Sequence, residues 1–496
     1  MLNRIVPPIG FALICLLVCS GSLLHRSLWI DELVTYDIAR LPFYKTGFLG
    51  NARPFGHSIL GYALQDPGPG PLMYLLDGMF AKLARPMGGE FWLRLPGIAA
   101  GALSCALLFA WLRRRAGFFG ASISALGAAL LPLLIEFYTG ARGYAWLVLI
   151  SIVQWRLIWA VMQERTHSVR VHLLFVGAST IGMLVNPMHT LWTGCLLIAL
   201  LVLRGMRSQQ GRGSGSVLIL LITTAVLHGA YIALWFYAMK ASGAGTAATV
   251  RGNVELSYIL RRMLEQKPVL QLLLINTALA LPLLFVRRTP ARFQGLLGLC
   301  TTLGSVLLLA VLCSRFFAAP RYFYALVLCS IISAGFLVQR AFNFMRLRGS
   351  RSASQVALLV CSVLVVTVLV GPARNRAKTP LQDWWGAAEY LREHAGPNDI
   401  VLTGPNSEYE VYRLYANTAG VKAQAPLLVE DATRKQHHLD RADGLGMLLE
   451  RGRAVWFVTA AFGQHRTLEY WQLLRANFDE AARIPGRTDL VIYRKR

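Results

Sequence analysis

The sequence predicts a polytopic α-helical membrane protein that ends in a small α/β domain. Of the 496 residues, 55% are hydrophobic and only 15% are charged, and the mean hydropathy is +0.48. One soluble core cannot bury apolar side chains in that proportion, so lipid must cover the rest. A change in composition divides the chain into a membrane domain, 1–372, and a more polar domain, 373–496.

Eleven apolar runs are long enough to cross about 30 Å of hydrocarbon. They lie near 7–25, 93–112, 118–137, 143–163, 171–187, 188–204, 216–238, 268–286, 294–314, 321–340 and 353–371. The first run resembles a signal peptide but lacks a convincing small-residue cleavage site. We therefore expect it to be a retained membrane span.

The distribution of charge predicts how these spans are oriented. The chain has 50 Lys and Arg against 25 Asp and Glu, whereas residues from Gly371 onward have 18 basic and 15 acidic side chains. The basic surplus therefore belongs to the membrane domain, where runs such as 113–115 fall in alternate loops. By the positive-inside rule these loops and the N-terminus are cytoplasmic, which places the loop 26–92 and the C-terminal domain on the outer side. We expect the excess charge to meet lipid headgroups and not nucleic acid.

Helical and strand patterns alternate in the C-terminal domain, which predicts a small α/β fold. We expect helices over 383–394, 409–415 and 467–477, and strands over 399–403, 454–458 and 489–493. The domain contains no glycine-rich nucleotide loop and no nucleophile elbow. Its predicted role is accessory or acceptor-handling.

The eight cysteines all lie within or at the ends of apolar runs and form no CxxC pair. They are therefore predicted to be small packing residues. The histidines show no metal-ligand spacing with cysteines or acids. No cofactor is indicated, and the sequence leaves a divalent cation open without showing a site for one.

Two adjacent carboxylates, Asp31 and Glu32, follow the first apolar run in the segment 27–37. The predicted topology places them at the outer membrane surface. A carboxylate there can accept a proton from a hydroxyl group, so both residues are candidate catalytic groups. The alternative is a helix cap, because apolar residues over 30–41 have helical spacing and acids suit a helix N-terminus.

Two arginines stand at predicted outer ends of spans, against the charge bias. Arg142 follows the third span, and Arg321 precedes Tyr322 at the start of the tenth. Guanidinium groups match phosphate oxygens and keep their charge at a membrane boundary. Arg142, Arg321 and Tyr322 are therefore candidates for binding a phosphate group. Snorkelling to the interface or a surface ion pair is the alternative.

Three aromatic residues at the same predicted side are further candidates: Tyr74, Tyr144 and His189. Tyr74 lies in the apolar segment 72–80, which predicts an interfacial helix with Pro71 at its first position. For His189, a hydrogen-bonded histidine at a helix end is the alternative. The Gly- and Ala-rich loop 239–267 is predicted to be a slack connector, with a lid over an outer cavity as the alternative.

Five short motifs occur in order along the membrane domain. They are Asp31-Glu32, the helix start Pro71–Leu76, Arg94-Leu95-Pro96, Glu136 followed by Ala141–Ala145, and Arg321-Tyr322. Their order and sidedness resemble those of the GT-C glycosyltransferases. The branch that looks most similar contains the bacterial relatives of protein O-mannosyltransferases and of the lipid A aminoarabinose transferase.

This resemblance implies inverting transfer of a sugar from a polyprenyl-phosphate donor, with Asp31 as catalytic base and Glu32 supporting it or orienting the acceptor. It also implies a lipid or glycan acceptor in cell-envelope or lipopolysaccharide synthesis, at the bacterial inner membrane. Many relatives have a His or Lys near the interfacial helix, where this chain has Pro69-Gly70-Pro71. Phosphate contact would therefore depend more on Arg142 and Arg321.

Two other classes of protein fit many spans with polar groups among them. A transporter of lipid-linked sugars or lipids is one, although we find no internal repeat of the kind that transporters often show. A non-catalytic assembly protein that binds partners through its C-terminal domain is the other.

Overall fold

The computed structural model describes most of the chain. It covers 2–24, 58–60, 63, 70–81, 89–140, 142–163, 169–205, 214–241, 256–286, 289–315, 320–348, 351–380, 382–396, 399–403, 455–460, 476–486 and 489–496. Two compact units are present. The first contains Met1–Ser20, Ile38–Met79 and Arg94–Asn375, and the second contains Gly21–Asp37, Phe80–Leu93 and Arg376–Arg496.

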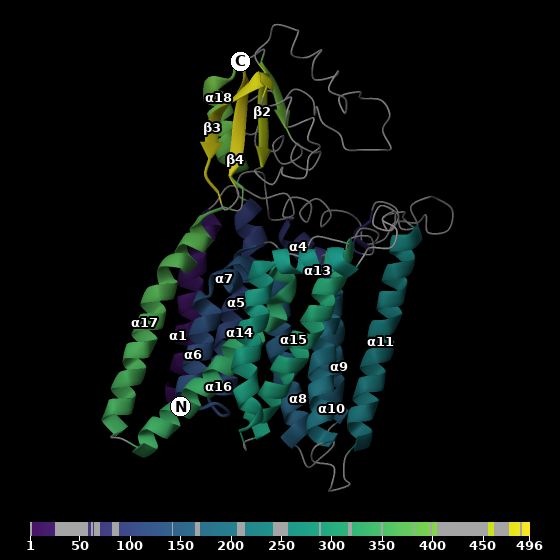
Figure 1. The fold of residues 1–496 in the computed structure, drawn as a ribbon, viewed down its shortest axis with the longest axis vertical. Coiled ribbons are helices and arrows are strands. Elements are labelled where there is room, and N and C mark those ends of the chain that lie inside the picture. Colours follow the sequence, from purple (N-terminus) through teal and green to yellow (C-terminus); the bar gives the residue numbers. More distant parts are fainter. Residues whose placement is uncertain are drawn as a thin grey trace. The chain divides into compact units, whose positions relative to one another are not determined.

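A helix lies over each of the eleven predicted runs (Figure 1). These helices are α1 (Leu2–Cys19), α5 (Gly89–Leu112), α6 (Gly117–Leu130) with α7 (Pro132–Thr139), α8 (Tyr144–Gln163), α9 (Val169–Val185), α10 (His189–Gly205), α11 (Ser214–Ala241), α14 (Lys267–Leu284), α15 (Thr289–Arg315), α16 (Tyr324–Arg348) and α17 (Arg351–Lys378). Among the described residues, six spans are long and apolar enough to cross a membrane, or seven if the bent pair α6–α7 counts as one.

The third predicted span, near 118–137, is divided into two helices with a bend between them. Helices α6 and α7 meet at an angle of 58°. Leu131 has extended backbone angles, and Pro132 follows it as the first residue of α7. The bend has a local cause, because proline disfavours a helical conformation in the residue before it.

Helices α6 and α16 approach so closely that glycine is required at the crossing. A Cβ atom added at Gly335 would lie 2.5 Å from the carbonyl oxygen of Gly120. Ser124 on α6 donates a hydrogen bond of 3.0 Å to the carbonyl of Ile331 on α16. Small residues at a crossing let two backbones touch, which is how membrane helices gain packing energy without a hydrophobic driving force.

Buried amide side chains join α14, α15 and α16. Asn276 on α14 donates to the Gly298 carbonyl at 2.8 Å and to Thr302 at 3.0 Å, both on α15. It also accepts a hydrogen bond of 3.3 Å from Ser330 on α16. A polar group in an apolar interior is costly unless it is bonded, so these contacts fix the arrangement of the three helices.

Residues 242–255 of the predicted connector 239–267 lie outside the described residues, but much of the described remainder is helical. It contains the helix α13, Leu256–Glu265, whose Ile259 and Met263 pack against a buried cluster of α14, α15 and α16 residues. These two side chains are four residues apart and therefore share one face of the helix. A Gly- and Ala-rich first half hid this short amphipathic stretch from the sequence analysis.

The short helix predicted over the apolar segment 72–80 is present. Helix α4 spans Pro71–Ala81, with Pro71 as its first residue as expected. Among the side chains that the structure describes, seven cysteines are free thiols; six of these are buried and Cys300 is half-buried. Their placement agrees with the predicted packing role.

The second unit contains a four-stranded sheet in the order β1-β2-β4-β3. The strands are β1 (Ile400–Thr403), β2 (Val455–Ala460), β3 (Phe478–Ile484) and β4 (Leu490–Lys495). β1 pairs with β2 in parallel, and the other two pairings are antiparallel. Helix α18, Trp384–His394, begins after Asp383, whose carboxylate accepts a hydrogen bond from the backbone N–H of Gly386.

The sequence analysis predicted α18, β1, β2 and β4 within two residues of their ends but missed β3. The β3 sequence, Phe-Asp-Glu-Ala-Ala-Arg-Ile, is rich in helix formers, and only Phe478 is buried in it. β3 exists because β4 offers it hydrogen bonds along a sheet edge. The predicted helix 409–415 lies outside the described residues, as does nearly all of the predicted helix 467–477.

Candidate active site

The α7–α8 turn carries two of the candidate residues. Helix α7 ends at Thr139, Gly140 is extended, and α8 begins at Tyr144. Arg142 lies in the turn and is half-buried. Tyr144 is 5% exposed, and its ring lies 5.4 Å from that of Phe137 on α7. The apolar part of Tyr144 thus anchors the turn that holds Arg142.

This turn meets the end of α9 and the start of α4. A Cβ atom at Gly143 would lie 2.7 Å from Cγ1 of Val185, the last residue of α9, and 3.2 Å from the sulfur of Met73 on α4. The N–H of Gly70, just before α4, donates to the Val185 carbonyl at 2.7 Å. The three segments therefore pack together, and glycine at both positions makes the close approach sterically acceptable.

Helix α4 presents buried polar groups in this region. Tyr74 is fully buried and packs against Ile59 and Ala63. Asp77, one turn further along, is 2% exposed. Arg94 near the start of α5 is 5% exposed. Charged side chains are almost never this buried unless they are paired. The burial of Asp77 and Arg94 therefore sets this region apart from the apolar remainder of the bundle.

A tight turn between α9 and α10 presents His189. The side-chain oxygen of Asn186 accepts a hydrogen bond of 2.9 Å from the N–H of Met188, and its backbone carbonyl accepts one of 2.9 Å from the N–H of His189. His189 is then the first residue of α10 and is fully buried. Its Nδ1 lies 2.7 Å from the hydroxyl of Tyr324 at the start of α16.

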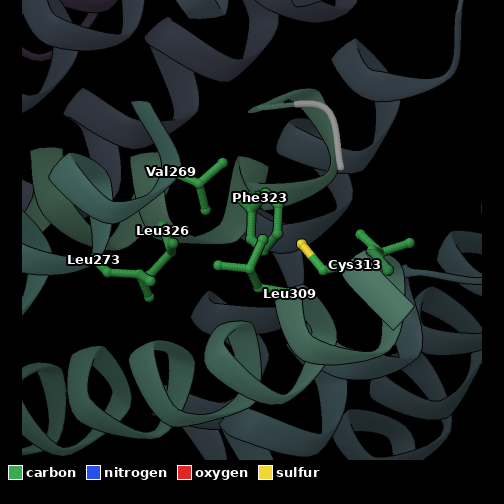
Figure 2. Close-up of a cluster of buried hydrophobic side chains, with 7 residues drawn as sticks. Val269, Leu273, Leu309, Cys313, Phe323 and Leu326 are labelled. Atoms are coloured by element: carbon green, nitrogen blue, oxygen red, sulfur yellow. The ribbon is translucent and has the colours of Figure 1, made fainter. Parts of the chain in front are cut away.

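The remaining candidates lie in the 3-10 turn η3, Pro320–Phe323, which leads into α16. Figure 2 shows Phe323 among buried side chains of α14, α15 and α16. Tyr322 is half-buried and packs on the same cluster. The guanidinium carbon of Arg321 lies 5.6 Å from the centre of the Tyr322 ring. Phe323 thus anchors the turn, and Arg321 and Tyr322 are held beside it.

Contacts of Gly143, Gly70 and His189 therefore bring the α7–α8 turn, the start of α4, the α9–α10 turn and η3 together at one end of the helical bundle. Arg142, Arg321, Tyr322, Tyr144, Tyr74 and His189 all lie on these segments. Asp31 and Glu32 lie outside the described residues. The roles assigned to all eight residues stay predictions.

The sequence analysis did not select three buried residues that lie at this end of the bundle. Asp77 was seen only as part of the apolar segment 72–80, and Arg94 only as part of a motif, although a charge inside an apolar run is itself a signal of function. Tyr324 gave no signal beyond its place in the aromatic run Tyr322–Tyr324. Its partner His189 is 135 positions away in sequence.

Among the residues that the structure describes, no three His, Cys, Asp or Glu side chains are grouped so that they could hold a metal ion. Asp31 and Glu32 are not among those residues.

No protein-family model matches the sequence, and no curated protein matches it. Solved structures do match. ArnT from Cupriavidus metallidurans bound to undecaprenyl phosphate aligns with a TM-score of 0.51 and 12% identity, over 100% of this chain and 98% of that one. ArnT is a lipid A aminoarabinose transferase of the GT-C superfamily. The chain therefore has the GT-C fold.

A second GT-C protein aligns over a smaller share of its own length. The oligosaccharyltransferase of Archaeoglobus fulgidus, tethered to an acceptor peptide, gives a TM-score of 0.53 at 10% identity, over 99% of this chain and 74% of that one. The oligosaccharyltransferase AglB from Archaeoglobus fulgidus, in complex with an inhibitory peptide and a dolichol-phosphate, gives a TM-score of 0.51 at 11% identity, over 95% of this chain and 70% of that one. The resemblance to GT-C proteins indicated by the sequence motifs is confirmed at the level of the fold.

Proposed function

We propose that this protein is an inverting glycosyltransferase that moves a sugar from a polyprenyl-phosphate donor to an acceptor hydroxyl. The observation that carries the proposal is that the α7–α8 turn, which carries Arg142, and the η3 turn, which carries Arg321, lie at the same end of a bundle with the GT-C fold. The similar ArnT structure holds undecaprenyl phosphate, and the similar AglB structure holds dolichol-phosphate. A lipid phosphate is thus the ligand chemistry that both the fold and the arginines suit.

In the proposed reaction, the acceptor oxygen forms a bond to the anomeric carbon while the bond from that carbon to the donor phosphate oxygen breaks. Both electrons of the broken bond stay on the phosphate, which gains negative charge as it leaves. Guanidinium groups beside it stabilise that charge, and their effect grows from the ground state to the transition state. Arg142 and Arg321 supply this stabilisation in the proposal.

The proton of the acceptor hydroxyl must go to a base. Asp31 is the proposed base, because a carboxylate in the first outer loop can accept a proton as the new bond forms. Glu32 supports Asp31 or orients the acceptor. Displacement from the face opposite the phosphate accounts for inversion at the anomeric carbon.

The proposed location is the bacterial inner membrane, with a cytoplasmic N-terminus and eleven spans. The reaction then takes place on the outer face, in cell-envelope glycan or glycolipid synthesis. The sheet-containing domain, 373–496, would be periplasmic and would serve the acceptor. This placement rests on the basic loops and on the odd number of predicted spans.

Replacement of Asp31 tests the proposed base. In membranes that contain a polyprenyl-phosphate sugar and acceptor, we expect Asp31→Asn to abolish transfer, measured by mass spectrometry of the acceptor. Expression and membrane insertion should match those of the unaltered protein. An Asn variant that still transfers sugar would remove Asp31 from the mechanism.

Replacement of Arg321 tests the phosphate contact. We expect Arg321→Ala to lower kcat about 100-fold, in line with the loss of one group that stabilises transition-state charge. Arg204→Ala is the matched control, because Arg204 is half-buried in the last turn of α10, where it donates to the Val161 carbonyl at 3.4 Å. Equal losses in the two variants would contradict a phosphate role for Arg321.

A further inference from the structure

His189 and Tyr324 form a buried pair that the proposed chemistry does not use. His189 is fully buried and Tyr324 is 2% exposed. Besides the 2.7 Å hydrogen bond, their rings are nearly parallel, at 7° with 6.3 Å between centres. The pair joins α10 to α16 within an apolar interior, where a satisfied hydrogen bond between polar groups strongly favours one arrangement.

The imidazole of His189 fits a space that a glycine leaves open. A Cβ atom at Gly182, on the facing side of α9, would overlap Cδ2 and Nε2 of the ring. The ring is thus held between the α9 backbone and the Tyr324 hydroxyl. With no exposed surface, His189 is placed to position its neighbours and not to contact a substrate.

Tyr324 directly follows η3, so the pair acts on the segment that carries Arg321. On its other side, His189 belongs to the α9–α10 turn. That turn follows Val185, which contacts the Gly143 turn beside Arg142 and accepts the hydrogen bond from Gly70. One hydrogen bond therefore connects the segment of Arg321 to the segments of Arg142 and α4.

We propose that the His189–Tyr324 hydrogen bond is a positioning clamp that fixes η3 and aims Arg321 at the leaving phosphate. The expected effect of the clamp on catalysis rests on the proposed function. Its expected effect on the structure of η3 is independent of that function. Breaking it leaves Arg321 present but no longer held in place. Such a loss affects the transition state, where the phosphate charge is largest, and therefore lowers kcat.

The test uses His189→Ala, Tyr324→Phe and the double variant that carries both changes. A fourth variant, His189→Asn, has an amide that can bond the tyrosine hydroxyl from a similar position. We expect about a ten-fold loss of kcat in each single variant, the value for one net hydrogen bond. The double variant should lose no more than either single one, because both remove the same contact. His189→Asn should recover most of the rate, and the KM for acceptor should stay unchanged.

Gln294→Leu is the control for general loosening of α16. Gln294 on α15 donates to Ser333 at 3.0 Å and to the Cys329 carbonyl at 3.1 Å, so it also ties α16 through a buried hydrogen bond. Its bonds lie further along α16, away from η3. We expect Gln294→Leu to change kcat less than two-fold even where it lowers thermal stability as much as His189→Ala. Equal losses of kcat would show that the clamp only stabilises the fold.

Hydrogen exchange of the η3 amides gives a readout that needs no transfer assay. We expect exchange at 321–324 to speed up in His189→Ala and Tyr324→Phe but not in Gln294→Leu. Unchanged exchange would overturn the clamp whatever the enzyme does. If exchange is faster in the two variants but the unaltered protein transfers no sugar, the clamp is supported and the proposed function is overturned.

Discussion

In the helical bundle, buried polar side chains form hydrogen bonds from one helix to another. In the sheet of the second unit, charged side chains form ion pairs at the surface. Gln154 on α8 is fully buried and donates to Ser179 on α9 at 2.8 Å and to Thr193 on α10 at 3.0 Å. In the sheet, Arg483 pairs with Glu480 at 2.9 Å, and each side chain is more than 40% exposed.

The difference follows from the surroundings of each unit. Lipid is as apolar as leucine, so packing and hydrogen bonds must join helices there. In water, burial of apolar side chains such as Phe457 and Val458 drives the sheet to fold. Exposed ion pairs add little to that. A buried polar group in the bundle is therefore informative, and the His189–Tyr324 pair is one example.

Close packing in the bundle gives the largest expected effect. Gly335→Val would push a side chain into the backbone of α6, and we expect a loss of about 3 kcal/mol in the free energy of unfolding. Thermal unfolding in detergent measures it. Gly194→Ala is the control, because no atom lies within 4 Å of the Cβ position there. If Gly335→Val were as stable as the control, the close crossing of α6 and α16 would be wrong.

Loss of an inter-helix hydrogen bond should cost less. We expect Asn276→Ala to lower the free energy of unfolding by about 1.5 kcal/mol, near the upper end for such bonds in membranes. Thr367→Ala should have little effect, because Thr367 on α17 is exposed and bonds only the Val363 carbonyl of its own helix. The same unfolding assay compares them. A larger loss for Thr367→Ala would reverse our ranking of buried and local bonds.

The helix cap at Asp383 should stabilise α18 by about 1 kcal/mol. We therefore expect Asp383→Ala to lower the free energy of opening of α18 by that amount. Asp383→Asn keeps the cap. Burial raises the pKa of Asp383, although the Gly386 N–H opposes this. A raised pKa in the folded state stabilises at low pH and loses that effect as pH rises through it.

Hydrogen exchange of α18, compared between variant and unaltered protein at each pH, checks both effects. We expect the unaltered protein to lose protection, relative to Asp383→Asn, as pH rises from about 4 to 7. A difference that stayed constant over this range would mean that the carboxylate titrates normally.

The smallest effect should come from the exposed ion pair. Arg483 is half-exposed and pairs with Glu480 across three residues of β3. We expect Arg483→Ala to leave the exchange of β3 and β4 amides unchanged within error. Faster exchange at β3 would mean that this edge strand depends on its surface charges.

Local sequence patterns determined much of this protein. Each apolar run became a helix because the runs are long, and a backbone in lipid must satisfy its own hydrogen bonds. Pro71 marked the start of α4, and short runs of apolar residues rich in Val and Ile marked β1, β2 and β4. The order of the five motifs indicated the GT-C fold, which the structural comparison confirmed.

Only the tertiary structure decided features that depend on distant partners. β3 forms because β4 lies beside it, against the helical preference of its own residues. The burial of Asp77 and Arg94 and the contact of Gly143 with Val185 likewise need segments far apart in sequence. His189 could be named from the sequence, but its partner could not. A hydrogen bond across 135 residues has no local pattern, because packing of whole helices sets it.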